Sequence, residues 1–185
     1  MNAPRLERLR PDELDADQRR LYEEIVGGPR SVSGSLVDEA GGLGGPFNAM
    51  LLSPPVGDAV QALGAALRYR SALPDRAREM ATLLVAHHCS SAYEWTAHEE
   101  HGRRAGLSDE EIASLRTARP MAADDVESAV VRCTRALLDT GDLDDALYAE
   151  AVAVLGRATV FELVTLVGYY RMLAGVLATF RVPGR

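Results

Sequence analysis

The stretch SSAYEWTAHEEHG, from Ser90 to Gly102, concentrates side chains that can transfer protons. It holds two of the four histidines and the single tryptophan, and the other two histidines lie just upstream. Glu94 and His98 are four residues apart and His101 follows three residues later, so a helix would place all three on one face. A carboxylate beside an imidazole favours the protonated ring, and such a pair can perform general acid–base catalysis. The spacing therefore predicts an acid–base site on Glu94 and His98.

The same residues also fit a purely structural role. Ser91 followed three positions later by Glu94 has the spacing of a capping box, which predicts that a helix begins there. Glu94 would then belong to the cap, and a Glu–His pair four residues apart is also common on helix surfaces. Both interpretations are open at this point.

Glu79 strengthens the catalytic interpretation. It lies on the preceding predicted helix, LPDRAREMATLLVAHH, 19 residues before His98. A hairpin of the two helices would bring its carboxylate back to His98, where it would orient the ring and decide which nitrogen carries the proton. Taken alone, a glutamate in RARE is usually the solvated partner of a neighbouring arginine. A zinc site is disfavoured, because HEEH lacks the four-residue His spacing of zinc-protease helices, and we expect no metal.

The elements that must position these residues are helices. Start signals, stop signals and apolar periodicity indicate helices over 16–26, 45–53, 56–70, 73–88, 91–102, 108–118, 123–141, 143–156 and 157–180. No segment alternates polar and apolar residues over the length of a strand, so the predicted fold class is all-α. We expect one structural domain overall, with an N-terminal helix and Gly/Ser-rich loop over 1–42 and a helical domain over 43–185.

Composition narrows the classes of function. The chain has 185 residues, 47% of them hydrophobic and 25% charged, which is typical of a soluble globular protein. Its net charge is −7 with no basic stripe, so we expect no nucleic-acid partner. The polar N-terminus lacks a secretory signal, and the apolar segment FELVTLVGYYRMLAGVLATF carries two charges and is expected to fall short of a spanning helix. We expect a cytoplasmic protein without a membrane partner, in which Cys89 and Cys133 stay reduced.

The run RAREMATLLVAHHCSSAYEWTAHEEHGRRAGLSDEEIASL resembles the carboxymuconolactone decarboxylase family, which includes the alkylhydroperoxidase D-like proteins. FELVTLVGYYRMLAGVLATF resembles the closing helix of that family, and GPFNAMLLSP resembles a segment ahead of its core. The resemblance covers roughly residues 43 to 182. It implies an all-α bundle around a central helix hairpin, assembled as a homo-oligomer: a trimer or hexamer, with a dimer also open.

The chain departs from the redox motif of that family. The motif has a Glu, a Cys, a second Cys three residues later and a His four residues after that. Glu79 and His98 match its ends, but Ser91 and Glu94 occupy the two cysteine positions, and Tyr93 lies where peroxidase members often have a histidine. A peroxidatic thiol needs a reactive thiolate and a resolving partner, which serine and glutamate do not supply. The resemblance therefore implies the decarboxylase branch rather than the peroxidase branch.

The implied activity is that of a cofactor-free lyase or isomerase acting on a small lactone or carboxylated metabolite. Glu94 and His98 would be base and acid in either order, with Glu79 orienting His98. The residues expected to line the substrate pocket are Phe47, Asn48, Met50, Ser91, Tyr93 and Trp95. Two alternatives stay open: an alkylhydroperoxidase or peroxiredoxin-type antioxidant protein, and a non-catalytic ligand-binding or scaffold member of the family.

Overall fold

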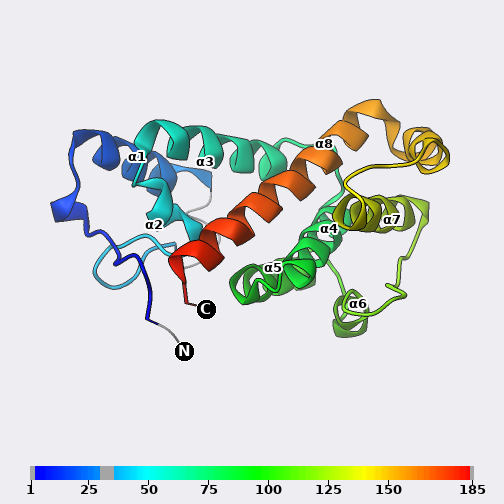
Figure 1. The fold of residues 1–185 in the computed structure, drawn as a ribbon, viewed down its shortest axis with the longest axis horizontal. Helices are drawn as coiled ribbons and strands as arrows, with labels where there is room; N and C mark the ends of the chain where they lie inside the picture. The colour runs from blue at the N-terminus through cyan, green and yellow to red at the C-terminus, as the bar shows by residue number, and fades with distance from the viewer. Residues whose placement is uncertain (1–2, 30–35, 184–185) are drawn as a thin grey trace. The chain divides into compact units, whose positions relative to one another are not determined.

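The computed structural model describes residues 3–29 and 36–183, and the predicted all-α fold is confirmed there. Beyond the helices, this part of the chain has an isolated antiparallel bridge between Val37 and Leu43. The elements are a 3-10 helix η1 (Pro11–Glu13) and the α-helices α1 (Ala16–Gly27), α2 (Pro46–Met50), α3 (Pro54–Tyr69), α4 (Asp75–His88), α5 (Ala92–Arg104), α6 (Asp109–Ser114), α7 (Asp125–Asp139) and α8 (Asp145–Phe180). Their ends lie within two residues of the predicted ones, except that α2 and α6 end three and four residues before the predicted ends at 53 and 118 (Figure 1).

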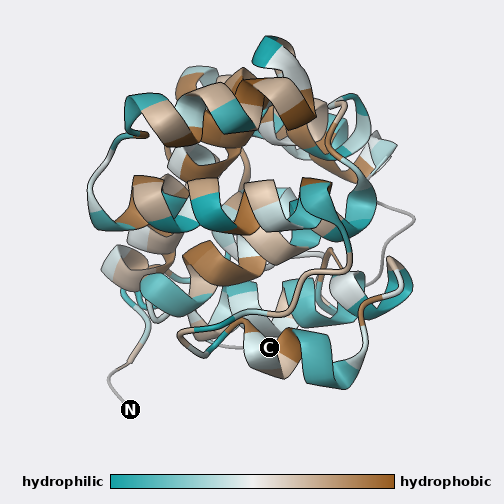
Figure 2. Cartoon of the chain, turned by 90° about the vertical axis from the view of Figure 1, so that its right-hand side faces the viewer, coloured by the Kyte–Doolittle hydropathy of each residue, from teal (hydrophilic) through white to brown (hydrophobic). Residues whose placement is uncertain are grey.

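The described residues form two compact units, one of residues 3–70 with 176–183 and one of residues 71–175. The expected boundary between 42 and 43 and the expectation of a single domain stay predictions. Part of the predicted Gly/Ser-rich loop, at 30–35, lies outside the described residues. Hydrophobic residues are interleaved with hydrophilic ones along most helices (Figure 2). This pattern is typical of helices that bury one face.

The first unit packs α1 and α2 against α3. Gly57, in the first turns of α3, permits this packing, because a Cβ there would lie 2.3 Å from the carbonyl oxygen of Met50 and 2.8 Å from Leu21 Cδ2. The N-terminal segment is held by Asn48, whose side-chain amide donates to the Glu7 carbonyl and accepts from the Leu9 N–H, each at 3.0 Å.

The second unit is built around α4, which packs against both α5 and α7 (Figure 1). Every residue from Met80 to Ala86 is buried, so α4 presents apolar side chains in all directions rather than on one face. A helix buried all round is a rigid support for side chains on its neighbours. The hairpin of α4 and α5 predicted from the sequence is therefore the centre of this unit.

The turn between α4 and α5 closes on a residue with positive φ. Ser90 has φ 53°, the Ser90 N–H donates to the His87 carbonyl at 3.0 Å, and the Ser91 N–H donates to the Ala86 carbonyl at 2.9 Å. This pair of bonds is the Schellman arrangement, which ends a helix and reverses the chain. The reversal lets α5 run back along α4.

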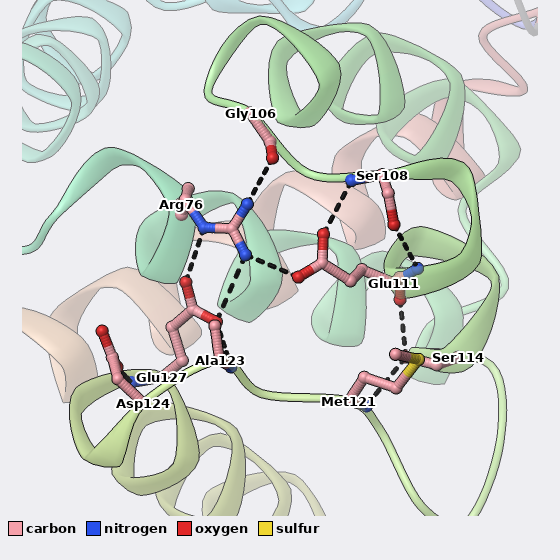
Figure 3. Close-up of polar contacts among 9 residues, drawn as sticks. All are labelled: Arg76, Gly106, Ser108, Glu111, Ser114, Met121, Ala123, Asp124 and Glu127. Atoms are coloured by element: carbon pink, nitrogen blue, oxygen red, sulfur yellow. Dashed lines mark hydrogen bonds and ion pairs between the residues drawn. The ribbon is translucent and has the colours of Figure 1, made fainter.

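An ion-pair network anchors the first turn of α4 (Figure 3). The Arg76 guanidinium bonds Glu127 on α7 at 2.7 Å, Glu111 on α6 at 2.6 Å, and the Gly106 carbonyl in the connection between α5 and α6. Glu111 also completes the predicted capping box with Ser108. One partly exposed side chain on α4 thus ties together α6, α7 and the connection between α5 and α6.

The last helix, α8, contains a break at Gly156, where φ is 78° and ψ is 156°. The sequence predicts a stop at this glycine, and the structure confirms it.

Within the described residues, α8 is long and apolar enough to cross a membrane by length and composition alone, with a mean hydropathy of 1.7 in its most apolar window. The expectation that this segment falls short of a spanning helix is wrong by that measure, because its charges are few. One such helix is weak support for a membrane protein, since core helices of soluble proteins have the same character.

Candidate active site

The α4–α5 hairpin brings Glu79 and Glu94 to opposite sides of the His98 ring. Glu79 Oε2 lies 2.7 Å from His98 Nδ1, and Glu94 Oε2 lies 3.4 Å from His98 Nε2. The three residues are 2%, 4% and 5% exposed in the order Glu79, Glu94, His98. Both ring nitrogens therefore face a buried carboxylate. We call these three residues the Glu–His–Glu cluster.

Arg78 contributes a second positive charge beside the cluster. Its guanidinium lies 3.5 Å from the other oxygen of Glu79, Oε1, and 2.8 Å from Asp75 Oδ1. The side chain of Arg78 is only 12% exposed. Two buried carboxylates with two cations have no net charge, which lowers the cost of removing them from water.

His98 is held as an imidazolium ion. Burial alone lowers the pKa of His98, but the charge and hydrogen bond of Glu79, followed by those of Glu94, outweigh burial and raise the pKa to about 9. A protonated imidazole donates from both nitrogens, which matches the two acceptors that face it. At neutral pH the ring therefore carries a proton on each nitrogen.

Aromatic rings close two further sides of His98. Tyr170 of α8 meets the His98 ring edge-on, with centroids 4.9 Å apart, and His101 does so at 5.4 Å. Tyr169 in turn packs edge-on against Tyr170. The contact of Tyr170 with His98 was not predicted from the sequence. The adjacent pair Tyr169 and Tyr170 in a largely apolar helix was the available signal, but Tyr170 lies 72 residues after His98 and no local spacing links the two.

The capping box predicted for Ser91 and Glu94 is wrong, although α5 does begin after Ser91. The Ser91 side chain makes no capping hydrogen bond, and its Oγ is buried without a partner among the described residues. The Ser91 N–H bonds the Ala86 carbonyl instead of Glu94. Glu94 is turned toward His98, so its carboxylate is not used by the helix end.

The residues predicted to line a pocket are divided between the two units. Ser91 and Trp95 line a cavity of about 380 Å³ at the start of α5, and Tyr93 is buried. Phe47, Asn48 and Met50 lie on α2 in the first unit. Asn48 holds the N-terminal segment there, and a role for these three at a pocket wall stays a prediction.

Neither cysteine has the character of a redox thiol. Cys89 follows α4 and is partly exposed, and burial raises the pKa of its thiol despite the opposing charge of Arg171. Cys133 is buried on α7, and burial likewise raises its thiol pKa. A higher pKa reduces the thiolate fraction and with it the nucleophilicity.

Among residues 3–29 and 36–183 no group of three or more His, Cys, Asp or Glu side chains is arranged to hold a metal ion.

Comparison with known proteins agrees with the resemblance drawn from the sequence. The profile of the carboxymuconolactone decarboxylase family matches residues 54–136. No curated protein compared with the chain is a significant match. A protein of unknown function from Agrobacterium tumefaciens, described as a candidate antioxidant defence protein AhpD, has a TM-score of 0.66 and 20% identity over 76% of this chain and 98% of its own.

A second solved structure has the same fold. It is a cysteine-to-alanine variant of the debrominase Bmp8 in complex with 2,3,4-tribromopyrrole, with a TM-score of 0.67 and 13% identity over 100% of this chain and 93% of its own. Identities this low show a shared fold alone. The family resemblance is thus confirmed: residues 54–136 match the carboxymuconolactone decarboxylase family, in a chain with the helical fold of both solved structures.

Proposed function

We propose that the Glu–His–Glu cluster makes this chain a cofactor-free acid–base enzyme, a lyase or isomerase that acts on a small lactone or carboxylated metabolite. The observation that carries the proposal is the sandwich of His98, which has a buried carboxylate at each ring nitrogen. Perturbed pKa values held by burial and specific charge partners are concentrated at catalytic sites.

The two ring nitrogens of His98 would have different roles in the reaction. Glu79 fixes Nδ1 and keeps the ring protonated, so the proton on Nε2 is the mobile one, and Glu94 at 3.4 Å is its route. In a decarboxylation, the carbon–carbon bond to the substrate carboxylate breaks and carbon dioxide leaves. The electron pair stays on carbon, conjugated with the lactone carbonyl, and takes the proton that His98 supplies through Glu94. Water then returns a proton to His98, and the hydroxide that remains combines with the released carbon dioxide to give bicarbonate.

The site chemistry favours this proposal over a peroxidase. Ser91 and Glu94 stand where the redox dithiol of the family would be, and burial raises the thiol pKa of both Cys89 and Cys133. Burying two carboxylates and an imidazolium costs desolvation energy. A non-catalytic member of the family would gain no activity in return for that cost.

The proposal is tested with a panel of small lactone carboxylic acids in deuterated water. Proton NMR follows substrate loss and deuterium at the reacting carbon, and released carbon dioxide is measured in parallel. For a substrate of the wild type, His98→Asn and Glu94→Gln are expected to lower kcat by about 100-fold or more, the range of general acid–base catalysis.

Glu100→Gln is the matched control, because Glu100 is an exposed carboxylate on the same helix that pairs with Arg104. Its kcat should stay within about twofold of the wild type, as for surface charges in general. Undiminished turnover in folded His98→Asn would overturn the mechanism. Rapid peroxide consumption with a Cys89–Cys133 disulfide seen by intact mass would favour the antioxidant alternative instead.

A further inference from the structure

Two cavities of the second unit share their lining at His87 and Arg116. The larger, of about 450 Å³, extends from the end of α4 to α7, and the smaller, of about 380 Å³, lies at the turn into α5. Small-molecule sites in proteins have volumes of this order. None of the residues in the Glu–His–Glu cluster lines either cavity.

The shared residue Arg116 is held in place by an aromatic ring. Its guanidinium lies 3.7 Å from the centroid of the Trp95 ring, and His87 meets the same ring edge-on with centroids 6.3 Å apart. A stacked guanidinium keeps its N–H donors in the plane of the fork, free to bind an oxyanion in bidentate fashion. Among the described residues, Arg116 has this ring contact and no carboxylate partner.

A second arginine adds positive charge to the larger cavity. Arg135 lines it together with His88 and one acidic residue, Asp139. One guanidinium nitrogen of Arg135, Nη1, donates to the Ala118 carbonyl at 2.6 Å, which fixes the side chain and leaves its other nitrogens available. In a chain with a net charge of −7, two arginines and two histidines gather here around one acid.

Apolar side chains complete the lining of the two cavities. Leu84, Leu115 and Leu138 lie against the larger cavity but are buried, at 5%, 1% and 7% exposed. The smaller cavity has the more apolar lining, with Ala86, Ala92 and the Trp95 ring. A ligand with a charged head and an apolar body would contact this lining as well as the arginines.

We propose that these joined cavities form a binding site for a small organic anion, with a carboxylate or phosphate head held between Arg116 and Arg135 and an apolar body against the lining of the smaller cavity. No residue of the Glu–His–Glu cluster lines this site, although its smaller cavity includes Ser91 and Trp95, two residues expected at the substrate pocket. Anion binding here is tested without reference to the function proposed for the cluster. We call these joined cavities the Arg116 site, defined by His87, His88, Arg116 and Arg135.

Trp95 makes the site directly observable, because it is the only tryptophan of the chain and Arg116 lies on its ring. The full-length protein is titrated with benzoate, phenyl phosphate and inorganic phosphate, with tryptophan fluorescence and isothermal calorimetry as two independent readouts. We expect saturable binding of benzoate or phenyl phosphate with a fluorescence change, and at least tenfold weaker binding of inorganic phosphate. The Kd of benzoate compared with that of phenyl phosphate shows whether the site prefers a carboxylate or a phosphate head group.

Variants locate the binding. Arg116→Gln and Arg135→Gln are each expected to raise the calorimetric Kd at least tenfold, and Arg119→Gln, an exposed arginine that lines neither cavity, should leave it within twofold. Circular dichroism checks that each variant folds. If Arg116→Gln does not fold, the comparison of Arg135→Gln with Arg119→Gln is used instead. The proposal is overturned if neither organic anion binds saturably, or if Arg119→Gln weakens binding as much as the other two variants.

Discussion

Glu79 and His98 are joined by a 2.7 Å contact between Oε2 and Nδ1, across a helix hairpin whose turn contains three residues, 89–91. The contact is buried, and it fixes Nδ1 of the imidazole while Nε2 meets Glu94. We propose that the two carboxylates have different roles as a result: Glu79 holds and charges the ring, and Glu94 is the partner through which a proton moves.

The raised pKa of His98 makes the stability of the fold depend on pH. The folded-state pKa is about 9, against 6.5 for an ordinary histidine. The unfolded chain therefore releases this proton first as pH rises, so the stabilisation is fully present below about pH 6.5 and is lost through pH 9. We expect the free energy of unfolding to fall over this range by no more than about 3 kcal/mol.

Urea unfolding followed by circular dichroism between pH 6 and pH 10 checks this expectation. Glu79→Gln is the control. It removes the charge that contributes most to raising the pKa of His98, so the unfolding free energy of this variant should depend less on pH. A wild-type stability that is constant or increases from pH 6.5 to 9 would show that His98 is not held as an imidazolium.

Arg76→Gln is expected to destabilise the second unit strongly. The change leaves Glu127 and Glu111 without their guanidinium partner, and the Glu127 side chain is only 6% exposed. Removing one partner of a buried ion pair costs about 3–5 kcal/mol, and the partial exposure of Arg76 puts this change at or below the lower end of that range. Chemical unfolding measures the loss, and Arg104→Gln, which breaks an exposed pair with Glu100, should cost less than about 1 kcal/mol. Equal effects of the two variants would mean that the network in Figure 3 adds little stability.

Two serines at helix starts should respond differently to alanine. Ser108 Oγ accepts from the Glu111 N–H at 3.1 Å, so Ser108→Ala should lose about 1 kcal/mol of unfolding free energy. Ser91 Oγ is buried with no hydrogen bond, so Ser91→Ala should be neutral or slightly stabilising. Thermal and urea unfolding of the two variants side by side make the comparison. A cost at Ser91 equal to that at Ser108 would indicate that Ser91 does cap α5.

The parts of the fold and site that follow local patterns could be predicted from the sequence. Helix starts at Asp15 and Ser108, the break at Gly156 and the hairpin of α4 and α5 all depend on neighbouring residues or on helical periodicity. The meeting of Glu79 with His98 follows from the same periodicity, once two helices reverse across a short turn.

The other features depend on contacts that no local spacing encodes. Arg76 bonds residues 35 and 51 positions away, and Tyr170 reaches His98 from another helix. The Ser91 prediction failed because local spacing offered Glu94 two partners. Within α5 the carboxylate contacts His98 four residues later instead of the helix start, and the buried carboxylate of Glu79 from α4 holds His98 in place for that contact.

The titration of His98 tests the central claim most directly. Wild-type protein labelled at histidine is followed by NMR from pH 5 to pH 11, and His98→Asn identifies the resonance. The Glu–His–Glu cluster predicts a single imidazole that stays protonated through neutral pH and titrates near 9. A His98 resonance that titrates at or below 6.5 would contradict the buried imidazolium and with it the proposed acid–base site.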